Sequence, residues 1–255
     1  MATWCIRGQG IQFTWPRQSQ PTIDIAELEI KIGERVLLRG PSGSGKSTLL
    51  SLLAGVHSVQ AGSLSILDAE LSQLSQRKRD KFRADHIGYI FQQFNLLPYL
   101  SVIQNVLLAI DFSKTRAKRL ADRSISAQAE SERLLTRLGI AADLWLKPAG
   151  NLSVGQQQRV AAARALIGAP ELIIADEPTS ALDTDARDTF LNLLNEECEQ
   201  QKITLVFVTH DTTLSHHFDR IIQLADINCN SKDIANAAVE SDLNDSAAYN
   251  GNKEA

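Results

Sequence analysis

Short apolar stretches alternate with longer amphipathic ones along most of this 255-residue chain. The apolar stretches are rich in Ile, Val and Leu, as the buried strands of a parallel sheet are. Strands are predicted over residues 10–15, 23–30, 34–39, 63–67, 87–91, 171–175, 203–208 and 220–224. Helices are predicted over residues 46–55, 102–110, 115–138, 155–168, 184–200 and 211–217. The alternation indicates an α/β fold built on a mainly parallel sheet.

The alternation stops between about residues 92 and 150, where no strand pattern is found. This stretch predicts a helical subdomain inserted into the α/β body. From residue 226 the chain is rich in Asp, Asn, Ser and Ala and poor in large apolar residues, which is typical of a disordered tail. We therefore expect one domain over 1–225, with its helical subdomain at about 92–150, and a disordered acidic tail over 226–255.

Composition and charge exclude several classes of protein. Hydrophobic residues make up 44% and charged residues 22% of the chain, which excludes a wholly disordered, collagen-like or disulfide-scaffold protein. Residues 226–255 hold six acids and two bases, which accounts for the whole net charge of −4. The neutral body has no global attraction to nucleic acid. A local basic run over 77–83 fits either a contact with lipid head groups or a partner, or a solvated helix face.

The cysteines and the apolar runs indicate in which cellular compartment the chain is expected and whether it is expected to span a membrane. Cys5, Cys198 and Cys229 lie far apart, are odd in number and lack metal-site spacing, as expected of free thiols in a reducing cytosol. The N-terminus has no apolar signal-peptide core. The longest apolar stretches, 106–110 and 203–208, are far shorter than the ~20 residues that span a bilayer. Any link to a membrane is therefore expected to come through a partner.

The segment GPSGSGKST, residues 40–48, follows a predicted strand and precedes a predicted helix. It fits the P-loop pattern G-x-x-x-x-G-K-[ST], and this context makes a chance Gly/Ser-rich turn the weaker interpretation. Glycines let the backbone N–H groups converge on phosphate oxygens, Lys46 reaches the β- and γ-phosphates, and Ser47 offers a hydroxyl to Mg²⁺. The expected binding residues for ATP are Gly40, Pro41, Ser42, Gly43, Ser44, Gly45, Lys46, Ser47 and Thr48.

Two further apolar strands end in residues suited to phosphate chemistry. ELIIADEP, residues 171–178, ends in Asp176, which can hold Mg²⁺, and Glu177, which can act on an attacking water as general base. Taken alone, the two acids would also suit a helix N-cap. His210 ends LVFVTH, where it can reach the γ-phosphate, although a lone histidine there would more often be a surface loop residue.

The segment NLSVGQQQRVAAARAL, residues 151–166, completes a resemblance to the ATP-binding cassette (ABC) ATPases, because it looks like their LSGGQ signature. The motifs occur in family order over about 225 residues. Stretches 87–106 and 174–183 are most similar to the lipoprotein-release and macrolide-export (LolD/MacB) group. The resemblance implies a P-loop NTPase (RecA-like) core with a mainly parallel sheet, an antiparallel β part and an inserted α-helical subdomain.

The resemblance also implies roles for single residues. Gln92 matches the glutamine that links metal and water to the helical subdomain. Asp176 matches the Walker B aspartate, Glu177 the catalytic glutamate and His210 the switch histidine. The signature residues, which in the family cap the γ-phosphate bound by the opposite subunit, correspond to Ser153, Gly155 and Gln156. The D-loop across the dimer corresponds to Ser180, Ala181, Leu182 and Asp183.

Two positions depart from the family pattern. Trp15 stands where the family often has an adenine-stacking tyrosine, with Phe13 expected on the same strand face; a core aromatic is the alternative. Val154 replaces the first glycine of the signature. Valine disfavours positive φ, so it damages the cap if that site needs a glycine-only conformation and costs little if the site opens an ordinary helix. We expect reduced but real ATPase activity.

The expected function is that of an ATP-hydrolysing subunit, using ATP and Mg²⁺, that drives a separate transmembrane permease. It would act as a homodimer or with a sister cassette, peripherally at the cytoplasmic face of the inner membrane, without nucleic acid. A groove at 92–99, with Phe94, Leu96 and Leu97, would dock a permease helix, unless that loop packs internally. The alternatives are a soluble ABC ATPase acting on DNA or ribosomes, or a weakly hydrolysing regulator.

Overall fold

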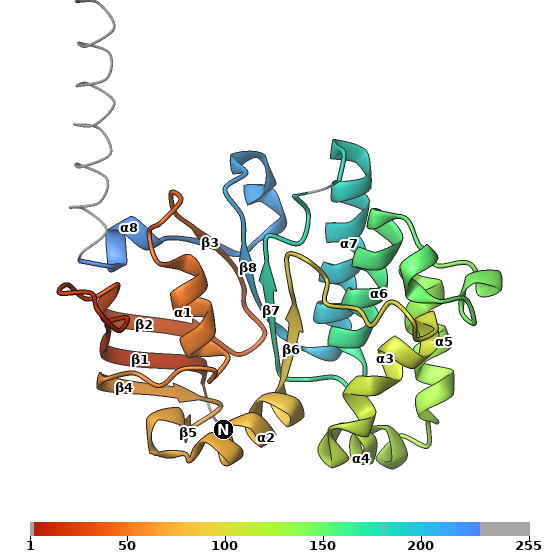
Figure 1. Cartoon of the computed structure of the whole chain (residues 1–255), viewed down its shortest axis with the longest axis horizontal. Helices are drawn as coiled ribbons and strands as arrows, with labels where there is room; N and C mark the ends of the chain where they lie inside the picture. The colour runs from red at the N-terminus through yellow and green to blue at the C-terminus, as the bar shows by residue number, and fades with distance from the viewer. Residues whose placement is uncertain (1–2, 181, 230–255) are drawn as a thin grey trace, which may run out of the picture.

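The computed structural model describes residues 3–180 and 182–229 and contains two β-sheets (Figure 1). One is antiparallel, in the order β2-β1-β4-β5. The other is parallel, in the order β6-β7-β8-β3-β9. The strands are β1 (Trp4–Phe13), β2 (Ile23–Lys31), β3 (Arg35–Arg39), β4 (Ala61–Ile66), β5 (Ala69–Glu70), β6 (Ile87–Ile90), β7 (Leu172–Asp176), β8 (Thr204–Val208) and β9 (Arg220–Gln223).

Helices cover both faces of the parallel sheet. The α-helices are α1 (Lys46–Leu53), α2 (Gln76–His86), α3 (Val102–Asp111), α4 (Lys114–Asp122), α5 (Ala127–Arg137), α6 (Val154–Leu166), α7 (Thr184–Gln201) and α8 (Leu224–Ile227). The 3₁₀ helices are Leu71–Gln73, Ala142–Leu144, Ala149–Asn151 and Thr212–His217. No helix in the described part of the chain is long and apolar enough to cross a membrane.

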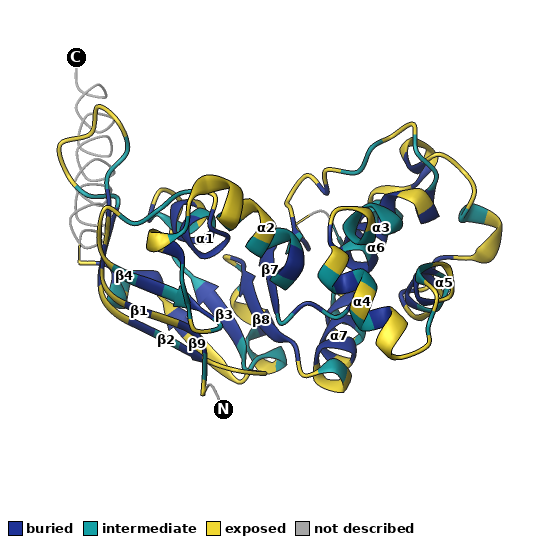
Figure 2. Cartoon of the chain, turned by 90° about the horizontal axis from the view of Figure 1, so that it is seen from below, coloured by how far each residue is buried: buried dark blue, intermediate teal, exposed yellow. Residues whose placement is uncertain are grey.

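The parallel strands send alternate side chains into two different cores. Leu172 and Ile174 of β7 pack in one cluster with α1 and the antiparallel sheet. Ile173 and Ala175 pack in the other, with α3, α5, α6 and α7. Successive side chains of a strand point to opposite faces, so a strand buried on both sides reads as a continuous apolar run. Figure 2 shows this burial along β3, β8 and the inner side of α7.

Each predicted strand overlaps an observed one, but several elements were placed wrongly. The first strand begins at Trp4, not at residue 10, and the short β5 was not predicted. The predicted helix 115–138 is two helices, α4 and α5, because Ser124 adopts a left-handed φ of 55° and Ser126 caps α5. The predicted helix 211–217 is a 3₁₀ helix, and α2 was not among the predicted helices.

Between β6 and α6 the described chain forms helices and turns, with one isolated β-bridge between Ser101 and Pro148. The predicted tail is corrected at its start. Residues 226–229 are folded: Asn228 is buried at 1% exposure and the backbone of Cys229 donates to the Asp24 carbonyl at 2.9 Å. The remainder of the predicted tail lies outside the described residues.

Candidate functional site

The phosphate loop lies between β3 and α1, and its backbone bends at two glycines. Gly43 has a φ of 77° and Gly45 a φ of 98°, a region that other residues enter only with strain. A Cβ on Gly45 would also lie 2.9 Å from Ile23 Cδ1. Gly45 is the N-cap of α1, whose first turn has no capping side chain in the described structure. Such a helix start presents backbone N–H groups to an anion.

Lys46 is folded back over this loop. Its Nζ donates to the carbonyl oxygens of Gly40 and Pro41, each at 2.8 Å. Ser47 is exposed beside it. The lysine charge and the helix start therefore converge on one point, as the P-loop pattern predicts.

Asn228 supports the loop from behind, and sequence reasoning missed it. Its Nδ2 donates to the carbonyls of Thr22 at 3.0 Å and Ser44 at 3.3 Å, and its Oδ1 accepts from the Asp24 backbone N–H at 2.8 Å. Ser44 itself is 1% exposed. Asn228 thus positions the phosphate loop on β2. The sequence did not indicate this role, because Asn228 lies 184 residues from Ser44, in a stretch whose composition is typical of a disordered tail.

The other predicted residues follow neighbouring strands. Because β6, β7, β8 and β3 are parallel and adjacent in that order, their carboxyl ends form one edge of the sheet. Gln92 follows β6, Asp176 and Glu177 end and follow β7, His210 follows β8, and the phosphate loop follows β3. The topology therefore brings these groups together in a row, with the two acids between Gln92 and His210.

Glu177 and His210 are in direct contact. His210 Nδ1 lies 3.4 Å from Glu177 Oε2; the histidine side chain is 71% exposed and the glutamate 21%. The Glu177 backbone N–H donates to the Val208 carbonyl at 3.0 Å, which holds it to the end of β8. Glu177 has a φ of 43°, a left-handed conformation that costs a non-glycine residue free energy. A strained, half-buried carboxylate beside an exposed imidazole is suited to general-base chemistry.

The carboxyl of Asp176 has a raised pKa. Burial raises this pKa, the neighbouring Glu177 raises that pKa further, and Lys46 acts in the opposite direction. Tyr89 lies nearby, and burial together with Asp176 raises the pKa of its phenol. Two crowded carboxylates with one opposing cation form a site that a divalent ion would stabilise.

The oxygen donors here fit Mg²⁺. They are the Asp176 carboxylate, the exposed Ser47 hydroxyl and the Gln92 amide, which are hard ligands of the kind that Mg²⁺ takes together with nucleotide phosphates. The described residues contain no group of three or more His, Cys, Asp or Glu side chains able to hold a metal.

Trp15 lies against the phosphate loop rather than on a strand. Its Nε1 donates to Thr48 Oγ1 at 3.1 Å. Its ring makes edge contacts with Phe13 and His57, at centroid distances of 5.1 and 4.9 Å. Trp15 is partly buried and packs against the core that includes Phe13, so a packing role stays open beside adenine stacking, although β1 ends at Phe13 and Trp15 is not on a strand. His57 is a neighbour that the sequence did not indicate.

The signature residues lie on another part of the chain. In Figure 1, α6 and α1 lie on opposite sides of β6 and β7. Ser153 caps α6: its Oγ accepts from the Gln156 N–H at 3.3 Å, and the Gln156 side chain accepts from the Ser153 N–H at 2.9 Å. Gly155 packs near Leu182 of the predicted D-loop; Ala181 lies outside the described residues. The structure thus does not bring these residues to the phosphate loop of the same chain.

Val154 is the first residue of α6 and has helical backbone. The idea that this site needs a glycine-only conformation is therefore wrong, since a valine at a helix start costs little. Its side chain is 50% exposed. The expected reduction in turnover has no backbone cause in this structure.

The loop after β6 needs a correction. Phe94 is 8% exposed and belongs to the helical core, so internal packing, not docking, explains it. Phe94 and Asn95 have left-handed φ values of 57° and 48°, and Arg164 donates to both of their carbonyls, at 2.6 and 2.7 Å. Leu96 also packs against this core, and Leu97 is half-buried. The exposed aromatics here are Phe91 and Tyr99, at 38% and 74%.

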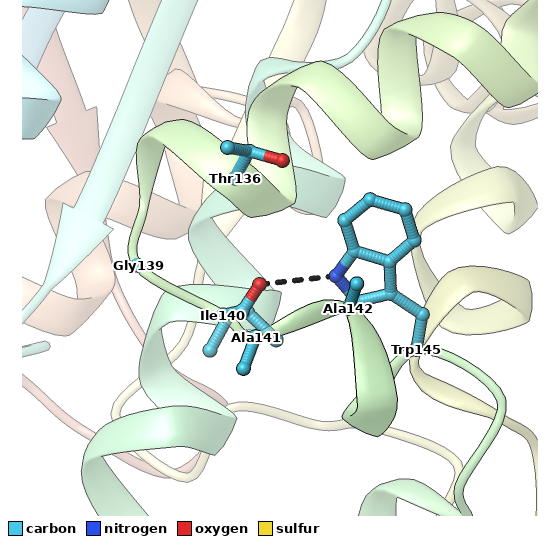
Figure 3. A pocket seen from close by; sticks show the side chains of 6 residues that line it. All are labelled: Thr136, Gly139, Ile140, Ala141, Ala142 and Trp145. Carbon is cyan, nitrogen blue, oxygen red and sulfur yellow. Dashed lines mark hydrogen bonds between the residues drawn. The ribbon is translucent and has the colours of Figure 1, made fainter.

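A shallow hollow of about 370 Å³ lies away from this edge, on the helical part (Figure 3). It is lined by Thr136, Gly139, Ile140, Ala141, Ala142 and Trp145. Trp145 Nε1 donates to the Ile140 carbonyl at 3.0 Å, so the indole is already engaged. With no charged side chain in its lining, this hollow is not suited to a nucleotide.

Comparison with known proteins agrees with the geometry. The family model described as ABC transporter matches residues 23–180. The lipoprotein-releasing system ATP-binding protein LolD of Hydrogenovibrio crunogenus is 37% identical over 206 residues, covering 81% of this chain and 86% of LolD. The macrolide export ATP-binding/permease protein MacB of Pasteurella multocida is 38% identical over 221 residues, or 87% of this chain and 32% of MacB.

A solved structure shows the same fold. The dimeric ATP-binding cassette MJ0796, in a post-hydrolysis state bound to ADP and Pi, superposes with a TM-score of 0.76 at 33% sequence identity. The match covers 86% of this chain and 93% of that one.

Proposed function

The chain belongs to the ABC transporter family as an ATP-binding ATPase subunit of the LolD and MacB type, and we propose that it drives a separate transmembrane permease through closure of a cassette dimer. On this proposal it works at the cytoplasmic face of the inner membrane, held there by the permease. The observation that carries the proposal is the row of groups at the carboxyl edge of the parallel sheet, next to the phosphate loop.

Each group in the row has a distinct task. Lys46 exchanges its bonds to the loop carbonyls for bonds to the β- and γ-phosphate oxygens, which are stronger because both partners are charged. Glu177 takes a proton from the attacking water, and His210, in contact with it, orients that water and meets the γ-phosphate. Asp176, Ser47 and Gln92 would hold Mg²⁺, which would supply positive charge against the charge that develops on the phosphates.

The site of one chain is incomplete in this scheme. Ser153 and the start of α6 lie apart from the phosphate loop of their own chain, so they are free to meet the γ-phosphate of a second chain. ATP would then hold two chains together, and hydrolysis would release them. The dimeric cassette among the structural neighbours supports this arrangement.

The permease contact is proposed at the loop after β6. Phe91 and Tyr99 are exposed there, while Phe94 anchors the loop internally. Gln92 lies in the same loop as Tyr99. A shift of Gln92 on nucleotide binding would therefore move the loop and be transmitted to a permease bound at Tyr99.

Affinity-tagged protein, isolated from gently solubilised membranes of its own cell, tests this function. We expect a multispan membrane protein to co-purify, and the double variant Phe91→Glu/Tyr99→Glu to lose it while keeping its melting temperature. Val56→Glu, at a similarly exposed apolar position after α1, is the control and should retain it. Co-purification with ribosomes or DNA-bound proteins, and with no membrane protein, would support the soluble alternative instead.

A further inference from the structure

Exposed cations gather where α2 and α4 lie next to each other, along the lower edge of the molecule in Figure 1. The two helices are joined by Ser113, whose Oγ donates to Asp85 Oδ1 at 2.6 Å. The cations that point outward from α2, from α4 and from the residue after α4, here called the basic surface, are Arg77, Lys78, Lys81, Lys114, Lys118 and Arg123.

The basic surface is not used by the fold. In the described structure, none of its six cations forms an ion pair with a carboxylate. The inward bases of the same helices are all engaged. Arg83 pairs with Asp80 at 2.7 Å, Arg119 pairs with Glu171 at 2.5 Å, and Arg116 is buried against backbone carbonyls. The outward bases therefore have no structural task that would explain them.

The local charge is strongly positive on a chain whose net charge is −4. The exposed acids of these elements and the end of α3 are Asp80, Asp111 and Asp122, and Asp80 is already paired with Arg83. The six cations outnumber them. Because the rest of the body is close to neutral, an anionic surface would be attracted at this place.

An exposed aromatic lies beside the cations. Phe112, between α3 and α4, is 77% exposed. Phe112 follows the last residue of α3, and the exposed Tyr99 lies shortly before its first residue. Because α3 has 10 residues, the two ends of the helix are about 15 Å apart. A subunit held by a permease at Tyr99 would therefore have Phe112 and the basic surface within reach of the surrounding lipids.

We propose that the basic surface and Phe112 bind the anionic phospholipid head groups of the membrane around the permease. Cations attract the lipid phosphates, and an apolar ring beside them inserts at the boundary of head groups and acyl chains. The single Phe112, with no further exposed aromatic on α2 or α4, provides no series of rings on which nucleic-acid bases would stack. The inference rests on the proposed function, because that function brings the chain to a membrane.

Vesicle flotation of the full chain tests the inference without any permease. The probes are vesicles of phosphatidylcholine alone and vesicles containing about one third phosphatidylglycerol. We compare Lys78→Gln/Lys81→Gln/Lys118→Gln with Arg7→Gln/Lys147→Gln/Lys202→Gln, a control that removes the same charge from exposed positions elsewhere. A basic residue near an anionic membrane changes partitioning about fivefold, so the first triple variant should bind at least about tenfold more weakly.

The expected result is binding of wild type and control to the anionic vesicles alone, with loss on raising the salt from about 0.05 M to about 0.5 M. Phe112→Ser should weaken binding in the same assay. The first triple variant should keep the wild-type melting temperature, and the control should lose no more than the small contribution of two exposed ion pairs, Arg7–Glu29 and Lys147–Asp143. Both should keep basal ATPase activity.

Equal binding to neutral vesicles, or an unchanged first triple variant, would overturn the inference. Binding to duplex DNA without vesicle binding would also overturn it, in favour of a nucleic-acid surface. If vesicles bind but no membrane protein co-purifies from the cell, the proposed function fails and lipid binding stands; the reverse result overturns this inference alone.

Discussion

Single residues at the carboxyl edge of the sheet are placed for chemistry at a cost in stability. Burial and the neighbouring Glu177 raise the pKa of the Asp176 carboxyl, against the influence of Lys46. A carboxyl whose pKa is higher in the folded state than in the unfolded state destabilises the fold when it is ionised. That cost is fully present above the raised pKa and disappears as the pH falls through it. Asp176 therefore destabilises the free protein at neutral pH.

Asp176→Asn should raise the melting temperature at neutral pH, because it removes this cost. The difference from wild type should shrink as the pH is lowered through the raised pKa of Asp176. ATPase activity should fall by about a hundredfold or more, since an amide cannot replace the charge beside the phosphates. Thermal unfolding across pH and steady-state turnover measure both effects. Asp185→Asn, at an exposed position in α7, is the control, and a lower melting temperature for Asp176→Asn would contradict the argument.

Trp15 offers a second test at this scale. Its indole is fixed by Thr48 and by the edges of Phe13 and His57, which prepares a ring for stacking on adenine. Trp15→Ala should weaken ATP binding about fivefold and Trp15→Phe much less, because a stacked ring contributes about 1 kcal/mol. Titration with a fluorescent ATP analogue measures this. Trp145→Phe is the matched control, and equal affinities for Trp15→Ala and wild type would assign Trp15 to packing.

At the scale of elements, a charged cluster joins the helical part to the core. Arg133 of α5 donates to Glu130 on its own helix and to Glu197 on α7, at 2.9–3.0 Å, and both glutamates are 1% exposed. Burial opposes the ionisation of Glu197, but bonds from Arg133, Arg137 and Gln201 outweigh it and lower the pKa of that carboxyl. The resulting stability is present above the ordinary carboxyl pKa and is lost as the pH falls through the lowered value.

Arg133→Gln should destabilise the protein by about 2–3 kcal/mol at neutral pH, because it leaves the buried Glu130 without its cation and Glu197 with Arg137 alone. The loss should shrink at acid pH as Glu197 takes up a proton. Denaturant unfolding at both pH values measures it. Lys147→Gln breaks an exposed ion pair with Asp143 and should cost about 0.5 kcal/mol or less. Equal losses of unfolding free energy for the two variants would show that the cluster does not stabilise the packing of α5 on α7.

Periodicity predicted most elements because buried strands and amphipathic helices have local signals. It failed where tertiary contacts decide. The helix break at Ser124 depends on one left-handed residue, and the burial of Phe94, which was expected to line a docking groove with Leu96 and Leu97, depends on its contacts with the helical core. The positions of the phosphate loop, Asp176, Glu177 and His210 were predictable because each lies at the carboxyl end of a predicted strand. Asn228 and His57 were not, since their roles arise from contacts with distant segments.

At the scale of the whole molecule, the phosphate loop and the signature helix lie on separate parts of one chain. On the proposed function, a single chain holds two half-sites, each completed by the other half from a second copy. ATP would join two chains by completing these sites, and Val154, in ordinary helical backbone, would not prevent it.

The most direct test is the mass of Glu177→Gln in solution with ATP and Mg²⁺, measured by light scattering, because this variant should bind ATP without hydrolysing it. We predict a dimer with ATP, a monomer with ADP, and a monomer with ATP when Gly155→Asp is added, although that double variant still binds the nucleotide. A Glu177→Gln chain that is saturated with ATP and remains monomeric would contradict the shared site.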